Sequence, residues 1–303
     1  MGPAPVHFSI SWIGNSVIRK TGKSVRQTFS PGDSEIPGTS GKRRMIMNEN
    51  EPKTTEHSHT PQHPLWLSVV LSLFPGVALG MFIVGMAPVL EGWGLDPIFA
   101  LFGGIGLVIV PLELGCLAIV ARRTTGSWSP LAVTDYRSKI PPGRLLPMAI
   151  GLAIWFLFTL IAWISLLEGW VIDWLPSWVP DSILQFAQTN ADGGLPSAGI
   201  FAAFLLIAFV FNGLVGPMTE ELYFRGYLLP RIDRYGIWAP VLNTLLFSIY
   251  HVWTPWRWPQ IAVGFLPLAL AAWRTRSIYV SMIAHVTVNI IFLVMLTASF
   301  TAG

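Results

Sequence analysis

Three short runs of ionisable residues interrupt otherwise apolar stretches in the last third of this chain. They are Glu220-Glu221-Leu222-Tyr223-Phe224-Arg225, the segment from Phe247 to His251, and the segment from His285 to Asn289. Charged and imidazole side chains are costly to place in hydrocarbon, so such groups within membrane helices commonly mark a functional site. A carboxylate together with imidazoles is suited to activating water, and the chemistry these runs indicate is hydrolysis.

The first run divides into a supporting pair and a free acid. Glu221 and Arg225 are four residues apart with the acid first, which is the favoured orientation for an ion pair on one face of a helix. Glu220 lies about 100° away around the helix and is left free for chemistry. We therefore predict that Glu220 is catalytic and that Glu221 and Arg225 are structural support.

The other two runs repeat the four-residue spacing. Phe247 can pack beside His251 and restrict its imidazole, while His285 and Asn289 present an imidazole and an amide to one cavity. At about 1.5 Å rise per residue, all three runs fall at compatible depths in the inner half of the membrane. We predict His251, His285 and Asn289 as catalytic residues and Phe247 as support.

Two hydrolytic routes suit these residues. In the first, Glu220, His251 and His285 bind a divalent metal such as Zn²⁺, which polarises a carbonyl and activates a bound water. In the second, which is metal-free, Glu220 and His251 activate water directly, and His285 and Asn289 donate hydrogen bonds to the tetrahedral oxyanion. The residue types fit both routes.

The composition predicts a lipid bilayer as the surroundings of these residues. Of 303 residues, 52% are hydrophobic and 12% are charged, against roughly 25% charged in soluble domains. The formal net charge is only +3 and its basic residues are spread over tail and loops, which argues against a nucleic-acid partner. The single cysteine, Cys116, excludes an intrachain disulfide and a cysteine-based metal site.

Apolar segments that approach the ~20 residues of a spanning helix predict an all-α, polytopic transmembrane bundle of about seven spans. They cover residues 65–90, 97–121, 145–170, 198–230, 237–253, 259–273 and 277–299. Residues 1–64 are polar and have no periodic apolar face, which predicts a disordered cytoplasmic tail. A transmembrane domain then fills residues 65–303, with the protease-like core at about 198–292.

Loop charges predict the orientation in the cell membrane, because cytoplasmic loops are enriched in Lys and Arg. The second, fourth and sixth loops carry basic residues, and the first and third carry only acids. We therefore expect a cytoplasmic N-terminus and an external C-terminus, with Arg257 as the single basic residue on the outside. Tryptophans near the outer ends predict an aromatic belt, namely Trp170, Trp174, Trp178, Trp253, Trp256 and Trp258.

One further acid, Glu113, lies within the second apolar segment. Arg122 and Arg123 are near enough to the same inner end for Glu113 to pair with them or to snorkel. We treat Glu113 as accessory.

The three runs also resemble the motifs of a known family. Glu220 to Gly226 looks like an EExxxR box continued as FRG, Phe247 to His251 resembles an FxxxH box, and His285 to Asn289 resembles an HxxxN box. Their order and spacing are similar to those of the CAAX-protease and bacteriocin-processing (CPBP, or Abi) intramembrane proteases, related to the type II CAAX prenyl endopeptidase. The resemblance covers about residues 198–292.

This resemblance implies an all-helical membrane endopeptidase. We predict that it cleaves a peptide or protein substrate, itself membrane-associated, near the cytoplasmic side, at the depth where the three runs fall. It implies Glu220, His251, His285 and Asn289 as the catalytic set, with Glu221 and Arg225 supporting. Members are often described as metalloproteases, and a metal-free glutamate mechanism has also been proposed for the family. Both remain open here.

Two alternatives from other classes are a proton-coupled membrane transporter and a non-catalytic membrane scaffold or immunity protein. Glutamate and histidine at mid-membrane suit a transporter, although the sequence shows no internal repeat of the kind transporters often have. The apolar segments lack HExxH, GxSG and GxGD motifs, and the chain has no nucleotide-binding P-loop. Other intramembrane protease designs and nucleotide enzymes are therefore disfavoured.

Overall fold

The computed structural model describes residues 60–175, 177, 179–184 and 197–302. Within them the chain is helical apart from loops and one isolated antiparallel bridge between Arg137 and Ser277, which confirms the predicted all-α class. Of the predicted tail over residues 1–64, residues 1–59 lie outside this description. Residues 60–64 lead into the first helix, and the His63 backbone N–H donates to the Arg231 carbonyl at 2.8 Å.

Five helices of the described chain are long and apolar enough to cross a membrane. They are α1 (Leu65–Gly92); the run of α2 (Ile98–Gly104), η1 (Ile105–Ile109) and α3 (Val110–Thr125); α4 (Pro142–Leu166); the run of α7 (Ala198–Ile207), η4 (Ala208–Val215), α8 (Gly216–Glu220), η5 (Glu221–Leu228) and η6 (Leu229–Tyr235); and α11 (Ile278–Ala302). The remaining two apolar segments form α9 (Trp238–Tyr250), which is shorter, and α10 (Trp258–Thr275). The protein is therefore a multi-pass membrane protein.

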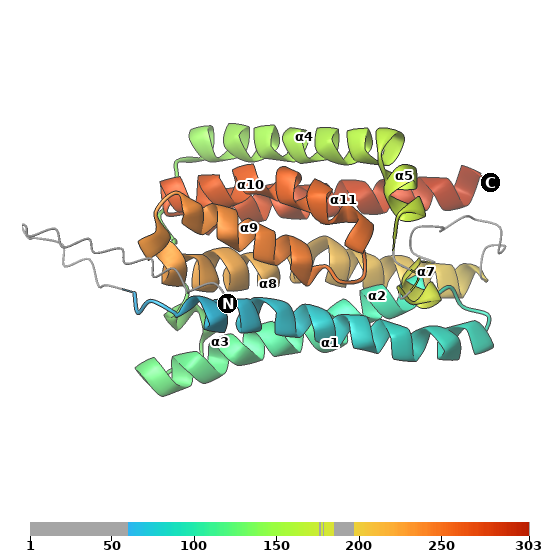
Figure 1. Cartoon of the computed structure of the whole chain (residues 1–303), viewed down its shortest axis with the longest axis horizontal. Helices are drawn as coiled ribbons and strands as arrows, with labels where there is room; N and C mark the ends of the chain where they lie inside the picture. Colours follow the sequence, from blue (N-terminus) through green and yellow to red (C-terminus); the bar gives the residue numbers. More distant parts are fainter. Residues whose placement is uncertain (1–59, 176, 178, 185–196, 303) are drawn as a thin grey trace, which may run out of the picture. The chain divides into compact units, whose positions relative to one another are not determined.

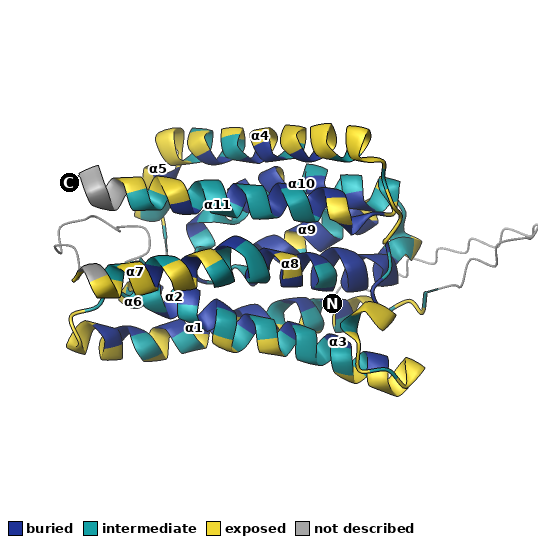
Figure 2. Cartoon of the chain, turned by 180° about the vertical axis from the view of Figure 1, so that it is seen from behind, coloured by how far each residue is buried: buried dark blue, intermediate teal, exposed yellow. Residues whose placement is uncertain are grey.

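The helices pack side by side as a bundle (Figure 1). α4 covers α10 and α11 on one side, and α1 packs against α2, η1 and α9 on the other. The long helix that carries Glu220 contacts α3, α9, α10 and α11. Its α8 and η5 segments are largely buried, whereas α1 and α4 present exposed faces (Figure 2). Large exposed side chains there are apolar, including Met81 and Phe158, as a lipid-facing surface requires.

Three stretches of the described helices are π-helical, which is rare and frequently found at functional sites. They are η1, η4 and η5, and the last two flank the α8 segment that ends at Glu220. Pro217 lies at the start of α8. Because proline has no N–H to donate, the regular hydrogen-bond ladder cannot continue through this position.

The connection between α9 and α10 lies inside the protein. It contains η7 (Pro255–Arg257), in which Trp256 is 0% exposed, and the neighbouring Trp253 is 5% exposed. The predicted membrane-facing belt is therefore wrong for Trp253 and Trp256. Trp170 and Trp174 do lie exposed, at 62% and 73%.

An acid on the short helix α5 (Glu168–Asp173) explains why this connection is buried. Glu168 Oε1 accepts hydrogen bonds from Trp256 Nε1 at 3.0 Å, and from Arg257 Nε at 3.0 Å and Arg257 Nη2 at 2.8 Å. Glu168 thus neutralises the one basic residue that departs from the charge pattern of the loops. Trp178, the remaining outer tryptophan of the third loop, lies outside the described residues.

Candidate active site

The structure brings the four predicted catalytic residues to one cavity. Glu220, His251, His285 and Asn289 all line a cavity of about 270 Å³. Most of its remaining wall is apolar, with contributions from α2, α4, α10 and α11. The three predicted support residues do not line it. The division into cavity-lining and supporting side chains therefore follows the one predicted from helical spacing.

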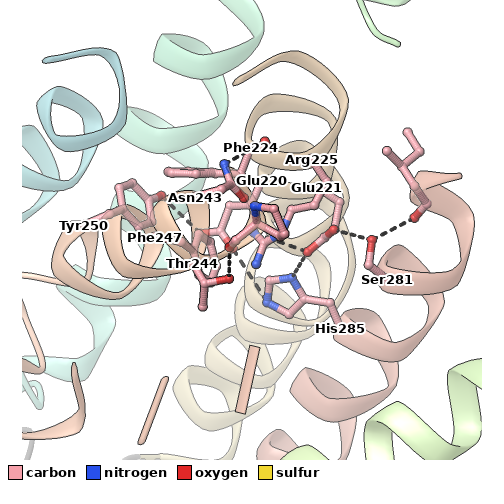
Figure 3. A network of polar contacts seen from close by, with 12 residues as sticks. Glu220, Glu221, Phe224, Arg225, Asn243, Thr244, Phe247, Tyr250, Ser281 and His285 are labelled. Carbon is pink, nitrogen blue, oxygen red and sulfur yellow. Dashed lines mark hydrogen bonds and ion pairs between the residues drawn. The ribbon is translucent and has the colours of Figure 1, made fainter. Parts of the chain in front are cut away.

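Glu220 ends α8, and its side chain is buried. Oε1 accepts a hydrogen bond from the Tyr250 hydroxyl at 3.1 Å. Oε2 lies 3.7 Å from Nε2 of His285. Figure 3 shows Tyr250 and His285 approaching this carboxylate from different helices. Oε2, with its weaker partner, is the oxygen available for chemistry.

Glu221 fixes the ring of His285. Its Oε1 lies 3.1 Å from Nδ1 of His285 and 3.5 Å from Nη1 of Arg225, while Oε2 accepts from the Ser281 hydroxyl at 2.6 Å (Figure 3). A carboxylate facing Arg225 accepts rather than donates, so Nδ1 of His285 carries a proton. The predicted Glu221–Arg225 pair is present, and Glu221 has the additional task of orienting His285.

Arg225 is completely buried, and aromatic rings replace most of its polar contacts. Its guanidinium carbon lies 4.1 Å from the ring centroid of Phe247 and 5.3 Å from that of Phe265. None of its guanidinium nitrogens makes a hydrogen bond to the described residues, which leaves the Glu221 ion pair as its main charge partner. Phe247 also packs edge-on against His251 at 4.7 Å between ring centroids, as predicted from their spacing.

His251 follows the last residue of α9, where its ring is held by its own helix. Nδ1 lies 2.8 Å from the Phe247 carbonyl oxygen. Because a carbonyl only accepts, Nδ1 carries the proton and Nε2 keeps a lone pair. Asn289 donates from Nδ2 to the carbonyl of Asn212 in η4 at 2.9 Å, which fixes its amide at the wall of the cavity.

A metal centre was predicted for Glu220, His251 and His285. The contact of His285 Nδ1 with Glu221 is the kind of outer contact that metal-bound histidines make. Among the described residues, however, no three His, Cys, Asp or Glu side chains form a group that could hold a metal ion. As arranged, these residues do not fit a three-ligand metal site.

Sequence reasoning missed two residues that touch the candidate site, Tyr250 and Ser281. Ser281 stands four residues before His285, so the spacing rule used for the other pairs would have found it. Tyr250 directly precedes His251, and only the packing of α9 against the long helix brings its hydroxyl to Glu220.

Glu113 was misread. It was expected to pair with Arg122 or Arg123 or to snorkel to the inner surface, but it is 0% exposed. Its polar neighbours are Glu220, Tyr250 and Arg225. α3 packs against α8, and this contact places Glu113 behind the candidate site.

Comparison with known families agrees with the motif analysis. Residues 202–291 match the family model of type II CAAX prenyl endopeptidase Rce1-like proteins. The match begins in α7 and ends in α11, so it contains all three polar runs. No curated protein and no solved structure matches the chain. The family resemblance read from the three motifs is confirmed.

Proposed function

We propose that this protein, whose residues 202–291 match the family model of type II CAAX prenyl endopeptidase Rce1-like proteins, hydrolyses a peptide bond with water activated by Glu220. One observation carries the proposal: Glu220, His251, His285 and Asn289 line one largely apolar cavity. The family indicates a protease, and the cavity supplies a base, oriented imidazoles and an amide. A substrate segment that is itself apolar suits the remaining wall.

The proposed reaction begins with a water molecule between Glu220 and His251. Oε2 of Glu220 takes one proton as the water oxygen attacks the peptide carbonyl carbon, with the lone pair on Nε2 of His251 accepting a hydrogen bond from the same water. The Asn289 amide donates to the developing oxyanion, as does Nε2 of His285 when its ring carries a proton on both nitrogens. The carbon–nitrogen bond then breaks, and the proton held by Glu220 passes to the leaving amine.

The direct test uses purified protein in lipid nanodiscs and a quenched fluorescent peptide ending in a farnesylated CAAX sequence, beside its unprenylated twin and a membrane-peptide library. We expect Glu220→Gln to lower kcat/KM by ~100-fold or more, since removing a general base costs about this much. Asp181→Asn, on the exposed surface, is the matched control. Equal cleavage by wild type and Glu220→Gln would refute the assignment.

The metal-free route is the one that the arrangement supports, because Glu220, His251 and His285, although they line one cavity, do not form a group of three that could hold a metal ion. We therefore expect activity to survive chelation, and purified active protein to contain less than one equivalent of zinc by elemental analysis. Activity that is lost to a chelator and restored by stoichiometric Zn²⁺ would favour the metalloprotease prediction instead.

The orientation of the chain in the membrane determines on which side the cavity opens, and therefore on which side a substrate is cleaved. We retain the proposed cytoplasmic N-terminus, for which the basic loops are the support. Residues such as Ile98, Leu160 and Leu296 line the cavity, and they lie near the helix ends remote from those loops. With this orientation the cavity extends into the outer half of the membrane, which does not favour cleavage at the cytoplasmic side. Labelling of Thr254→Cys, beside the cavity, from each face of sealed vesicles tests which side has access.

A further inference from the structure

Glu113 is a buried acid that the proposed reaction does not use. It lies in the first turn of α3, directly after the π-helical η1. Its side chain is 0% exposed, and neither carboxyl oxygen makes a hydrogen bond to the described residues. It does not line the cavity, so a contact with substrate is not its task.

None of the neighbouring groups is a cation that is free to pair with Glu113. Its titratable and charged neighbours are Glu220 and Arg225 on the long helix and Tyr250 on α9, and it also interacts with Cys116 on α3 and Tyr223 of η5. Arg225 is the only cation among them, and it is already paired with Glu221 at 3.5 Å. Two carboxylates that share a water-poor site do not both ionise readily.

The Tyr250 hydroxyl decides where the proton resides. It has a single hydrogen, which it donates to Oε1 of Glu220 at 3.1 Å. Glu113 is the second carboxyl group beside this hydroxyl. With its hydrogen directed to Glu220, the hydroxyl oxygen can only accept from Glu113. An ionised Glu113 would meet a lone pair and a second carboxylate, whereas a protonated Glu113 can donate.

We propose that Glu113 is a positioning residue that stays protonated and turns its O–H toward the Tyr250 hydroxyl, which completes a chain of donors that ends at Oε1 of Glu220. The chain fixes the Glu220 carboxylate and leaves Oε2 as the basic atom at the cavity. Glu113 neither gains nor loses a proton in the reaction. The inference rests on the proposed role of Glu220 as base.

The first experiment measures protonation without any substrate. Infrared difference spectroscopy of the full-length protein at pH 7 should show the carbonyl band of a protonated carboxyl group, and Glu113→Gln should remove one such band. Cys116→Ala, on the same helix, is the matched control and should retain it. An unchanged band in Glu113→Gln would overturn the proposal, whether or not the protein proves to be a protease.

The second experiment measures cleavage of the farnesylated CAAX peptide. Glu113→Gln keeps an N–H donor toward Tyr250, so we expect a loss in kcat of two- to fivefold. Glu113→Leu has no donor and should lose ten- to thirtyfold in kcat with KM changed less than twofold, and its pH–rate profile should shift. Tyr250→Phe breaks the same chain, so adding Glu113→Leu to it should cause little further loss.

A merely structural role predicts different results. The Gln and Leu variants would then lose similar activity with unshifted pH profiles, and the Leu and Phe losses would multiply in the double variant. Thermal melting of each variant in the same nanodiscs identifies those that fail to fold. If wild type cleaves no probe, the proposed function fails, while the infrared result still decides the protonation of Glu113.

Discussion

Removing one partner of the buried Glu221–Arg225 ion pair should cost unequal amounts of stability, depending on which partner is removed. Both side chains are 0% exposed and lie 3.5 Å apart. In Glu221→Gln, Arg225 keeps its charge but loses its nearest carboxylate, and it retains the aromatic contacts and the weaker influence of Glu220. Breaking a buried pair in this way costs about 3–5 kcal/mol, or roughly 150- to 5,000-fold in the unfolding equilibrium.

The reverse change should be milder. In Arg225→Met the flexible thioether can occupy the slot beside Phe247. The stranded Glu221 carboxylate still accepts from His285 and from Ser281, at 3.1 Å and 2.6 Å. We therefore expect a cost of about 1–2 kcal/mol, close to that of volume-conserving core changes.

Reversible unfolding in mixed micelles, with sodium dodecyl sulfate titrated into a mild detergent, measures both costs in the full-length protein. The double variant Glu221→Gln/Arg225→Met contains no uncompensated charge, so it should be more stable than Glu221→Gln alone. The asymmetry follows from the different numbers of remaining partners. Arg225→Met as costly as Glu221→Gln, or a double variant whose loss is the sum of the two, would refute this reasoning.

Two further predictions concern other parts of the fold. A Cβ on Gly76 would lie 2.0 Å from the Tyr250 carbonyl oxygen, so Gly76→Ala should cost about 1–3 kcal/mol by overpacking and lower activity, whereas Gly85→Ala on the same helix, with nothing within 4 Å, should melt like wild type. Partial burial, aided by the charge of Arg231, lowers the pKa of His63 from 6.5 to about 4. As pH falls, His63 is therefore protonated more readily when residues 60–64 are detached than when they are packed. The protection of their backbone amides, which is the intrinsic exchange rate at each pH divided by the observed rate, should fall as pH falls from 6.5 toward 4. His63→Gln should abolish that pH dependence, and an unchanged response would contradict it.

Spacing along single helices predicted those contacts of the candidate site that form between residues of the same helix. The pairs four residues apart have fixed neighbours wherever the helix lies, which is why the Glu221–Arg225 contact and the packing of Phe247 on His251 were predicted correctly. Glu113 and Tyr250 were misjudged or missed because their neighbours belong to other helices. Which residue of α3 faces α8 depends on packing angle and rotation, and no periodicity within α3 specifies either.

The depth of the polar residues in the membrane also could not be predicted from the sequence. The estimate of compatible depths treated the segment 237–253 as a complete span, although α9 has only 13 residues, or about 20 Å. Trp256 was taken as a membrane-surface residue for the same reason. Composition does not separate an apolar helix that crosses lipid from one enclosed by other helices, because both bury the same side chains.

The buried α9–α10 connection is compatible with the predicted orientation of the chain, but it changes which segment forms the wall of the candidate site. Two helices joined by a connection inside the bundle return the chain to the side from which it entered, as two complete spans also would. The basic residues before α9 and after α10 therefore fall on the same side of the membrane with either arrangement. Loop charges could not distinguish an enclosed connection from two complete spans for this reason. Since His251 and Arg257 lie on this connection and line the cavity, the enclosed turn rather than a surface loop forms one wall of the candidate site. Glu168 stabilises that turn by pairing with Arg257 at 2.8 Å, so the one apparent exception to the charge pattern is a residue that builds the cavity.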